Sequence, residues 1–362
     1  MDSFKIRELI RDNIATLVPY SSARSEYNVE GSLLLDANEN YREIIGNQEL
    51  NRYPDPLHTA LKDKIEKVLG LPKENLAIGN GSDELIDLLF RIFCNPKKDK
   101  ALLISPTYGA YEVFANINDV GVSHCQLKGD FTIDLKKMET VCKLVNNGTP
   151  HSGMHKLLFI CSPNNPSGNT FPIEQIEMMA GRFKGIVVVD EAYIEYAPTQ
   201  SVVKLIEKYP RLVILRTFSK AWALANVRVG IAVTSKEIVS IIERVKPPYN
   251  LSGVAQKLAI EALDHADDVK KEIKKTIQER QRVAAYLESH PFVEKVFPSE
   301  ANFLLVRVND PNHLCDFLKE RNIIIRNRSN IRGCYQSVRI SIGSVEQNEQ
   351  LISAMEELKE LI

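Results

Sequence analysis

The residues best suited to chemistry lie between positions 216 and 230, in the stretch RTFSKAWALANVRVG. This stretch carries the hydroxyls of Thr217 and Ser219, the amine of Lys220 and the guanidinium of Arg228. A lysine in a turn is usually a solvated surface residue. Here an apolar run at 212–215 precedes the lysine and another at 221–225 follows it, so we expect the amine to be partly removed from water. Desolvation lowers the pKa of a lysine and makes its amine a usable nucleophile.

Further reactive or polar side chains also follow short apolar runs. They are Ser82 and Asp83 next to Gly81, then Tyr108, Asn165, Asp190 and Tyr193. Each has an ordinary structural explanation when it is taken alone. Ser82 could cap a helix, Asn165 lies in the turn-forming sequence NNPSG, and Asp190 could cap a helix or bind a metal. The set points to one site only if the fold brings its members together.

One group of these residues suits a phosphate. The backbone amides of residues 81–83 would open a helix, where free N–H groups and the helix dipole bind anions. Arg228 offers a planar fork for the same kind of anion. The hydroxyls of Thr217 and Ser219 add two donors.

The remaining residues suit an aromatic aldehyde. Tyr108 offers a ring for stacking, and Asp190 offers an acceptor for a protonated ring nitrogen. Asn165 and Tyr193 can donate to a phenolate oxygen, and Lys220 can condense with an aldehyde. A phosphate, a pyridine nitrogen, a phenolate and an aldehyde occur together in pyridoxal 5'-phosphate, which we therefore expect as the cofactor.

The elements that must position these residues are short apolar strands alternating with helices. The strands are expected at 76–78, 102–104, 157–161, 186–189 and 212–215. Continuous apolar strands are typical of a parallel sheet that helices cover on both faces, so the pattern predicts a doubly wound α/β domain. The carboxyl ends of parallel strands meet at one edge, which is where such sheets bind small molecules.

The pattern changes near the sequence KPPY at 246–249. A charged helix is expected over 265–289, with strands at 303–308, 323–325 and 338–342 beyond it, which predicts a smaller α+β domain. We therefore expect an N-terminal arm over 1–32 with a helix at 4–15, a large cofactor-binding domain over 33–248 and a small C-terminal domain over 249–362.

Composition excludes several classes of function. The chain has 362 residues and a formal net charge of −1, so we expect no nucleic-acid or anionic-lipid partner. No apolar run is long enough to span a membrane, and the first residues lack a signal-peptide pattern. Six scattered cysteines without CxxC spacing favour reduced thiols in a cytoplasmic protein and no metal site.

Several motifs extend along nearly the whole chain and resemble those of fold-type I, class-I-like aminotransferases, more closely those of the histidinol-phosphate aminotransferase family. They are VPYSSAR at 18–24, LDANEN at 35–40, LNRYPDP at 50–56, GNGSDELIDLL at 79–89, SPTYGAY at 105–111, SPNNPSG at 162–168, VVVDEAY at 187–193, RTFSKAWALANVRVG at 216–230 and SVRISIG at 337–343. Departures from the family pattern at Ser167, Trp222 and Asn226 touch no cofactor-binding role.

The resemblance implies roles for further residues. Lys220, Asp190 and Tyr193 would be catalytic, with the lysine holding the cofactor and moving the proton. Tyr53 would reach the cofactor phosphate of a neighbouring subunit, which makes the active unit a homodimer with shared sites.

The resemblance also implies a substrate site. Arg339 would bind the anionic group of each substrate in turn, with Arg326 and Tyr20 as further contacts. Asn38 would help to close the pocket as the N-terminal arm folds over it.

The function that follows is transamination of L-histidinol phosphate with 2-oxoglutarate, which gives imidazole acetol phosphate and L-glutamate in histidine biosynthesis. Two alternatives share the scaffold: an aromatic-amino-acid aminotransferase, and a pyridoxal-phosphate-dependent decarboxylase of a phosphorylated amino acid. A non-catalytic ligand sensor would need an attached DNA-binding module, for which the chain has no basic segment.

Overall fold

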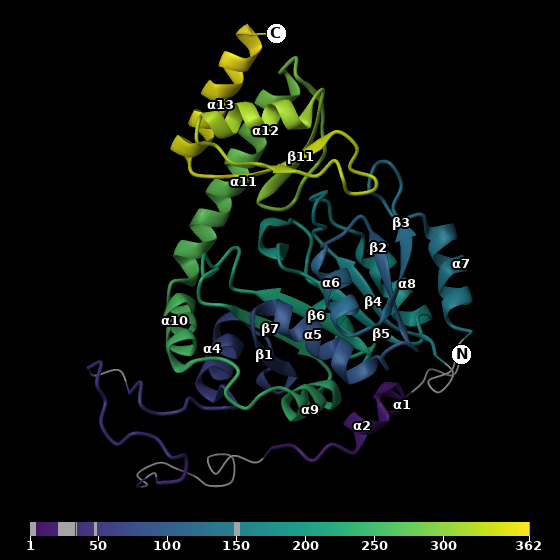
Figure 1. Ribbon diagram of the computed structural model, residues 1–362, viewed down its shortest axis with the longest axis vertical. Helices are drawn as coiled ribbons and strands as arrows, with labels where there is room; N and C mark the ends of the chain where they lie inside the picture. The colour runs from purple at the N-terminus through teal and green to yellow at the C-terminus, as the bar shows by residue number, and fades with distance from the viewer. Residues whose placement is uncertain (1–4, 21–32, 34, 47–48, 148–152, 362) are drawn as a thin grey trace.

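The computed structural model describes residues 5–20, 33, 35–46, 49–147 and 153–361. In this part of the chain a large unit built on a seven-stranded sheet lies below a smaller unit built on a four-stranded sheet, and one long helix connects the two (Figure 1). The α/β class expected from the sequence is therefore confirmed.

The seven-stranded sheet has the strand order β1-β7-β6-β5-β4-β2-β3. The strands are β1 (Leu76–Asn80), β2 (Lys100–Ser105), β3 (Gly121–Gln126), β4 (His155–Cys161), β5 (Ile186–Asp190), β6 (Leu212–Thr217) and β7 (Val229–Thr234). The five strands from β6 to β3 pair in parallel, whereas β7 runs antiparallel to both β6 and β1. The sheet is thus mostly parallel, as predicted.

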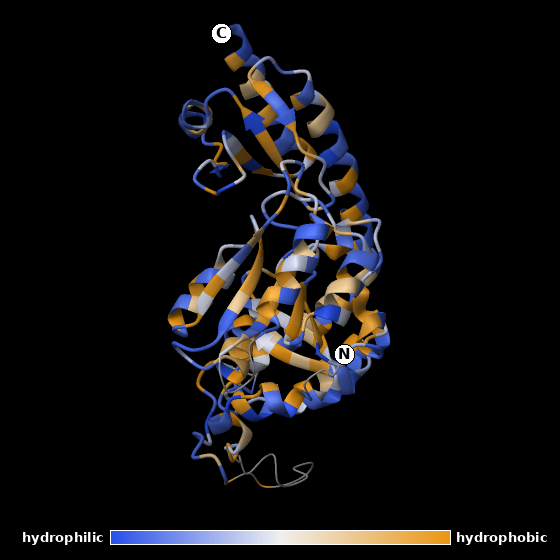
Figure 2. Cartoon of the chain, turned by 90° about the vertical axis from the view of Figure 1, so that its right-hand side faces the viewer, coloured by the Kyte–Doolittle hydropathy of each residue, from blue (hydrophilic) through white to orange (hydrophobic). Residues whose placement is uncertain are grey.

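Helices cover both faces of this sheet, which explains its continuous apolar strands. In β5, Val187 and Val189 join the core on one face, while Ile186 and Val188 join the core on the other. The first face is covered by α4 (Thr59–Leu69), α7 (Leu135–Val145), α8 (Ile173–Arg182) and α10 (Gly253–Asp264), and the second by α5 (Gly81–Phe93), α6 (Ala110–Ile117) and α9 (Lys236–Val245). Figure 2 shows the hydrophobic residues gathered on the strands and on the inner sides of these helices.

Short helices complete the large unit. They are α1 (Ile6–Leu9), α2 (Asp12–Ala15), η1 (Lys73–Asn75), η2 (Ile194–Tyr196) and η3 (Val202–Ile206). The single helix expected over 4–15 is wrong for its described part, because Ile10 and Arg11 are extended between α1 and α2. Ile6, Leu9 and Ile14 are buried against the sheet, and the Nζ atom of Lys156 donates to the Leu9 carbonyl at 2.8 Å. Tertiary contacts therefore interrupt the helix, although the hydrophobic residues of this segment follow a continuous helical pattern.

The smaller unit is an antiparallel sheet with the order β10-β11-β9-β8. Its elements are α11 (Ala266–Glu288), β8 (Val293–Val296), β9 (Phe303–Val308), α12 (Pro311–Glu320), β10 (Arg326–Asn327), β11 (Ser337–Ser341) and α13 (Val345–Glu360). The strand expected at 323–325 is wrong. The amide of Ile323 instead bonds to the carbonyl of Leu318 as α12 ends, and Ile323 and Ile325 pack against the unit's core.

The packing of α10 and of Leu251 before it concerns the predicted boundary between the large and the small domain. Leu251, Ala255, Ala259 and Leu263 join the core of the large unit, although they follow the boundary expected at 248/249. The three-part division of the chain stays a prediction, and most of the expected arm, residues 21–32, lies outside the described residues.

Candidate active site

The polar strand ends meet at one cavity of about 240 Å³. Its walls include Ser82, Asp83, Tyr108, Asn165, Asp190, Tyr193, Thr217, Ser219, Lys220, Arg228 and Arg339, all named from the sequence, together with Cys161, Ala192 and Arg328. The parallel register explains the convergence, since Cys161 lies opposite Asp190 and Asp190 opposite Leu215. The strands after which the sequence placed these groups therefore end at the same edge of the sheet.

Lys220 follows β6 on an irregular turn that continues to the start of β7. Phe218, Ala221 and Trp222 are buried beneath this turn. The first two residues of the apolar run at 221–225 thus dock against the protein as expected, whereas Ala223 and Ala225 are exposed. Lys220 is exposed as a whole residue, and its Nζ atom lies at the cavity wall, 5.6 Å from the centre of the Tyr193 ring. Partial burial, and next to it the positive charge of Arg339, lower the pKa of Lys220, which favours the neutral, nucleophilic amine.

Asp190 ends β5 at the cavity wall and is only 3% exposed. Its carboxylate accepts a hydrogen bond from the Tyr111 hydroxyl at 2.6 Å and another from the Ala192 amide at 3.0 Å. Burial raises the pKa of Asp190 to about 6, and the two hydrogen bonds oppose that rise. Lys220 is the cation that acts on Asp190, but no ion pair joins Asp190 to a described cationic side chain. A buried carboxylate of this kind is suited to a protonated ring nitrogen.

The first turn of α5 carries amide groups that suit an anion. Gly81 opens the helix with φ +73°, and its amide donates to the Arg228 carbonyl at 2.7 Å. The cap position is Asn80, whose side chain caps nothing, so the interpretation of Ser82 as the helix cap is wrong. Uncapped amides at the start of a 13-residue helix bind anions through free N–H groups and the helix dipole.

Arg228 closes this anion site from the side of β7. Its guanidinium donates to the Ser219 hydroxyl at 3.3 Å and to the Asp83 carboxylate at 3.4 Å. The hydroxyl of Thr217 accepts from the Ser219 amide at 3.1 Å and so holds the turn in place. Two hydroxyls, a guanidinium and a helix start make a donor set that fits a phosphate.

The opposite wall is a chain of hydrogen bonds. Arg339, from β11 of the smaller unit, donates to the Asn165 side-chain oxygen at 2.7 Å. The amide of Asn165 donates in turn to the Tyr193 hydroxyl at 3.3 Å, and the Tyr108 hydroxyl donates to Asp83 at 3.3 Å. The cavity therefore lies between the two units, and its wall includes the hydroxyls of Tyr108 and Tyr193.

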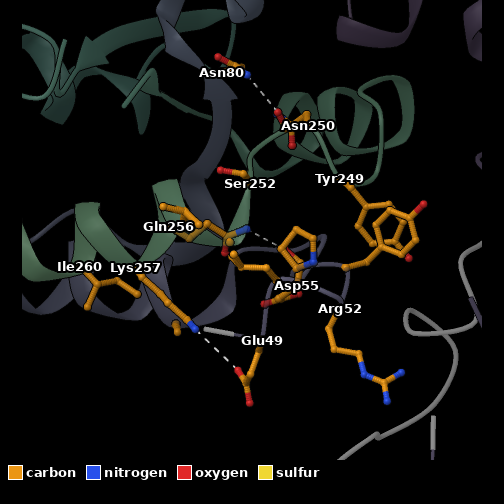
Figure 3. Close-up of a pocket in the computed structure, with 16 residues that line it drawn as sticks. Glu49, Arg52, Asp55, Asn80, Tyr249, Asn250, Ser252, Gln256, Lys257 and Ile260 are labelled. Carbon is orange, nitrogen blue, oxygen red and sulfur yellow. Dashed lines mark hydrogen bonds and ion pairs between the residues drawn. The ribbon is translucent and has the colours of Figure 1, made fainter. Parts of the chain in front are cut away.

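Four residues expected at the site lie elsewhere in this single chain. Tyr53 stacks on Tyr249 with ring centres 4.5 Å apart and lines a separate cavity of about 720 Å³ (Figure 3). Tyr20 is 77% exposed and lines a third cavity, Asn38 is exposed, and Arg326 is exposed on the edge strand β10. Their roles stay predictions, because three of them depend on an arm or a second subunit.

The structure brings two further residues to the site: Tyr111, to which sequence reasoning gave no role, and Arg328, which was weighed only together with Arg326 as a charge on a strand edge. Tyr111 lies three residues after Tyr108, in the first turn of α6, and packs with its ring 4.6 Å from that of Phe159. The second tyrosine of the sequence YGAY is the feature that could have pointed to Tyr111 from the sequence. Arg328 lines the cavity beside Arg339.

The described residues contain neither a metal-binding cluster nor a membrane-spanning helix. No group of three or more histidine, cysteine or acidic side chains there could hold a metal ion. All six cysteines are free thiols, five of them buried. No helix within the described ranges is long and apolar enough to cross a membrane.

The sequence model of the class I and II aminotransferases matches residues 24–355, and the chain belongs to this family. Members of the family are pyridoxal 5'-phosphate-dependent enzymes, so the expected enzyme class and cofactor are confirmed. The site fits that group on chemical grounds: a lysine with a lowered pKa, a buried carboxylate and an uncapped helix start surround one cavity.

Two similar relatives carry a more specific name. A histidinol-phosphate aminotransferase of Christiangramia forsetii is 42% identical over 99% of both chains, and one of Parabacteroides distasonis is 40% identical over 98% of this chain and 99% of its own. Among solved structures, the histidinol-phosphate aminotransferase of Clostridium acetobutylicum matches with a TM-score of 0.77 and 28% identity, over 87% of this chain and 92% of that one. The resemblance stated from the motifs is confirmed.

Proposed function

We propose that the chain transfers the amino group of L-histidinol phosphate to 2-oxoglutarate, giving imidazole acetol phosphate and L-glutamate in histidine biosynthesis. The observation that carries the proposal is a single cavity in which the amine of Lys220 and the guanidinium of Arg339 face the same space. Such a cavity suits a substrate that carries both an amine and an anionic group. The names of the nearly full-length relatives support the choice of substrate.

The bound cofactor supplies an electrophilic aldehyde and a ring that accepts electrons. We assign Lys220 to hold that aldehyde and, once freed, to move a proton at the substrate Cα. Asp190 would accept the hydrogen bond of the ring nitrogen and keep it protonated. Tyr193 and Asn165 would donate to the ring oxygen, and Tyr108 would offer its ring for stacking.

The cofactor phosphate is assigned to the start of α5. The amides of Ser82 and Asp83 would face the anion, while the Gly81 amide donates to the Arg228 carbonyl. The hydroxyls of Thr217 and Ser219 with the guanidinium of Arg228 would complete the donor set. Arg228 reaches this position with φ +58°, a strained conformation for a residue with a side chain. Strain of this kind, retained at a site, is consistent with a functional requirement.

The substrate anion is assigned to Arg339, with Arg326, Tyr20 and Asn38 as further contacts from segments that close over the site. The planar fork of an arginine binds a carboxylate or a phosphate equally well in geometry, so one residue can serve both substrates. The Asn165 oxygen holds the Arg339 fork in place at 2.7 Å.

We also propose a cytoplasmic homodimer in which Tyr53 completes the partner's phosphate site. Support comes from the segment that carries Tyr53, where Leu35, Tyr41 and Ile44 are more than four-fifths exposed. Exposed apolar surface of this extent marks an interaction site. The cavity that Tyr53 lines lies beside the same segment (Figure 3).

The test is spectroscopic. The purified protein loaded with cofactor should show a visible absorption band, and L-histidinol phosphate should convert that band to the amine form, with 2-oxoglutarate restoring it and L-glutamate appearing in equal amount. Conversion by phenylalanine but not by histidinol phosphate would favour the aromatic aminotransferase. Release of carbon dioxide from a phosphorylated amino acid without glutamate formation would favour the decarboxylase.

A further inference from the structure

We infer that Asn250 is a positioning residue for the cofactor phosphate, because it holds the carboxylate of Glu84 away from the amides that the phosphate needs at the start of α5. This role deepens the proposed function and rests on the phosphate position assigned there. Asn250 lines the separate cavity that also contains Tyr53, so it would act on the phosphate only through Glu84.

The backbone amides at the start of α5 can be accounted for one by one. The first four amides of any α-helix have no partner within the helix. Here the Asn80 amide donates to the Glu84 carboxylate at 2.6 Å, and the next amide, that of Gly81, donates to a backbone carbonyl at 2.7 Å. The amides of Ser82 and Asp83 are the two that remain for a phosphate.

The same helix turn carries two acidic side chains, Asp83 and Glu84. A carboxylate near a helix N-terminus is attracted by the same N–H groups and the same dipole that attract a phosphate. The Asp83 carboxylate is bound by the Arg228 guanidinium at 3.4 Å and by the Tyr108 hydroxyl at 3.3 Å. The Glu84 carboxylate needs a comparable partner, because it would otherwise compete for the amides and repel the phosphate.

Asn250 supplies that partner. Its Nδ2 atom donates to Oε2 of Glu84 at 2.7 Å, the same oxygen that accepts the Asn80 amide. Nδ2 also donates to the Ile78 carbonyl at 3.1 Å, and the Asn80 side chain donates to the Asn250 carbonyl at 3.3 Å (Figure 3). The Glu84 carboxylate is therefore held at the end of β1, beside the amide that precedes those assigned to the phosphate.

Lys246 fixes the orientation of the Asn250 side chain. Its ammonium group is buried, donates to Oδ1 of Asn250 at 3.3 Å and pairs with Glu243 at 2.9 Å. An ammonium group has donors only, so it selects the oxygen end of the amide and leaves the nitrogen end for Glu84. The segment KPPYN at 246–250, where the alternating pattern of the sequence ends, thus supports the cofactor site.

The test compares pyridoxal 5'-phosphate with pyridoxal, the same aldehyde without the phosphate, as ligands of the cofactor-free protein. Visible absorbance follows each titration. Asn250→Ala should raise the dissociation constant of the phosphorylated aldehyde about 10- to 100-fold, the loss expected for a hydrogen bond to a charged group. The constant for pyridoxal should stay within about 3-fold, because this ligand has no group for the amides.

A second substitution separates competition by Glu84 from a general loss of structure. Glu84→Gln removes the competing charge, so this variant should bind the phosphorylated aldehyde at least as tightly as the unsubstituted protein does. Combined with Asn250→Ala, it should bring the dissociation constant back to within about 3-fold of the unsubstituted value. Asn250→Asp keeps the side-chain shape and the contact with Lys246 but loses the donor, and it should repeat both the loss and the rescue.

The matched control is Ser252→Ala. Ser252 lines the same separate cavity and caps α10 by accepting a hydrogen bond from the Ala255 amide at 3.2 Å. Loss of this cap should lower the melting temperature and leave the ratio of the two dissociation constants unchanged. The melting temperature of each Asn250 variant, compared with this control, shows how much of its effect is loss of stability.

An unchanged constant for the phosphorylated aldehyde in Asn250→Ala, an equal loss for both aldehydes, or no rescue by Glu84→Gln would overturn the inference. Arg228→Gln reports separately on the assigned phosphate position, because it should weaken binding of the phosphorylated aldehyde alone. Turnover of L-histidinol phosphate enters none of these measurements, so a failure of the proposed substrate would leave their result intact.

Discussion

Asp190 shows how one buried carboxylate is tuned by its neighbours. Burial alone would favour the protonated acid, and its pKa of about 6 lies above the ordinary value of 3.8. The Tyr111 hydroxyl at 2.6 Å favours the charged form. Because the folded state holds the proton more tightly than the unfolded chain, the stability contributed by Asp190 falls as pH rises from about 4 to about 6.

Tyr111→Phe should destabilise the cofactor-free protein more at pH 8 than at pH 5. At pH 8 the Asp190 carboxylate is ionised, and the lost bond is one to a charged group, about 1.5–3 kcal/mol. At pH 5 the folded protein holds mostly the acid, and the loss is about 0.5–1.5 kcal/mol. Urea unfolding of the cofactor-free protein at the two pH values measures the difference.

The matched control is the same substitution in an Asp190→Asn background. The side chain at 190 is then neutral at both pH values, so the cost of Tyr111→Phe should no longer depend on pH. A dependence that persists in this background would mean that Tyr111 acts through another group.

At the residue scale, the sequence identified the groups that touch the proposed cofactor but not those that support them. Lys220, Asp190 and Arg228 follow apolar strands and carry obvious chemistry. Tyr111 resembles any aromatic residue on an amphipathic helix, and Arg328 any charge on a solvated edge strand. Their importance arises from contacts across the fold, which no local pattern encodes.

At the scale of elements, a close approach between β7 and α5 sets the position of the anion site. Gly230 lies opposite Gly79 in the antiparallel pair of β7 and β1. A Cβ atom on Gly230 would lie 2.2 Å from the Ser82 nitrogen, which is backbone and cannot move aside cheaply. The absence of a side chain there allows the first turn of α5 to rest on the start of β7.

Gly230→Ala should push the start of α5 away from Arg228 and weaken cofactor binding about 5- to 150-fold, because forced overpacking costs about 1–3 kcal/mol. Titration of the cofactor-free protein with pyridoxal 5'-phosphate, followed by absorbance, measures the change. Gly129→Ala is the control, since a Cβ atom there would meet nothing within 4 Å. Unchanged affinity in Gly230→Ala would show that α5 tolerates the shift.

The elements that were predicted well are those with an unbroken apolar run. β4, β5 and β6 are buried on both faces, and this leaves a plain signal in the sequence. β3 was not predicted because it is an edge strand whose residues, GVSHCQ, are mostly half-exposed. The triplet at 323–325 is apolar without being a strand, since it packs on the core as a loop.

At the scale of the whole molecule, the proposed dimer can be tested by mixing two defective chains. Lys220→Ala removes the amine, and Tyr53→Ala removes the group proposed to act on the partner's phosphate site. After unfolding and refolding together, mixed dimers should contain one intact site, so roughly one quarter of the original site number should return with random pairing. Each variant refolded alone is the control, and failure of the mixture to exceed them would contradict shared sites.

The long helix α11 also has a mechanical consequence. Ala266, Val269 and Ile273 near its start pack against the large core, while Val283 and Leu287 near its end belong to the small one. A 23-residue helix is a rod about 35 Å long. Arg328 and Arg339 belong to the smaller unit, which is attached to the end of α11. A small tilt of α11 at its start would therefore move both guanidiniums toward a bound substrate together, without changing their positions relative to each other.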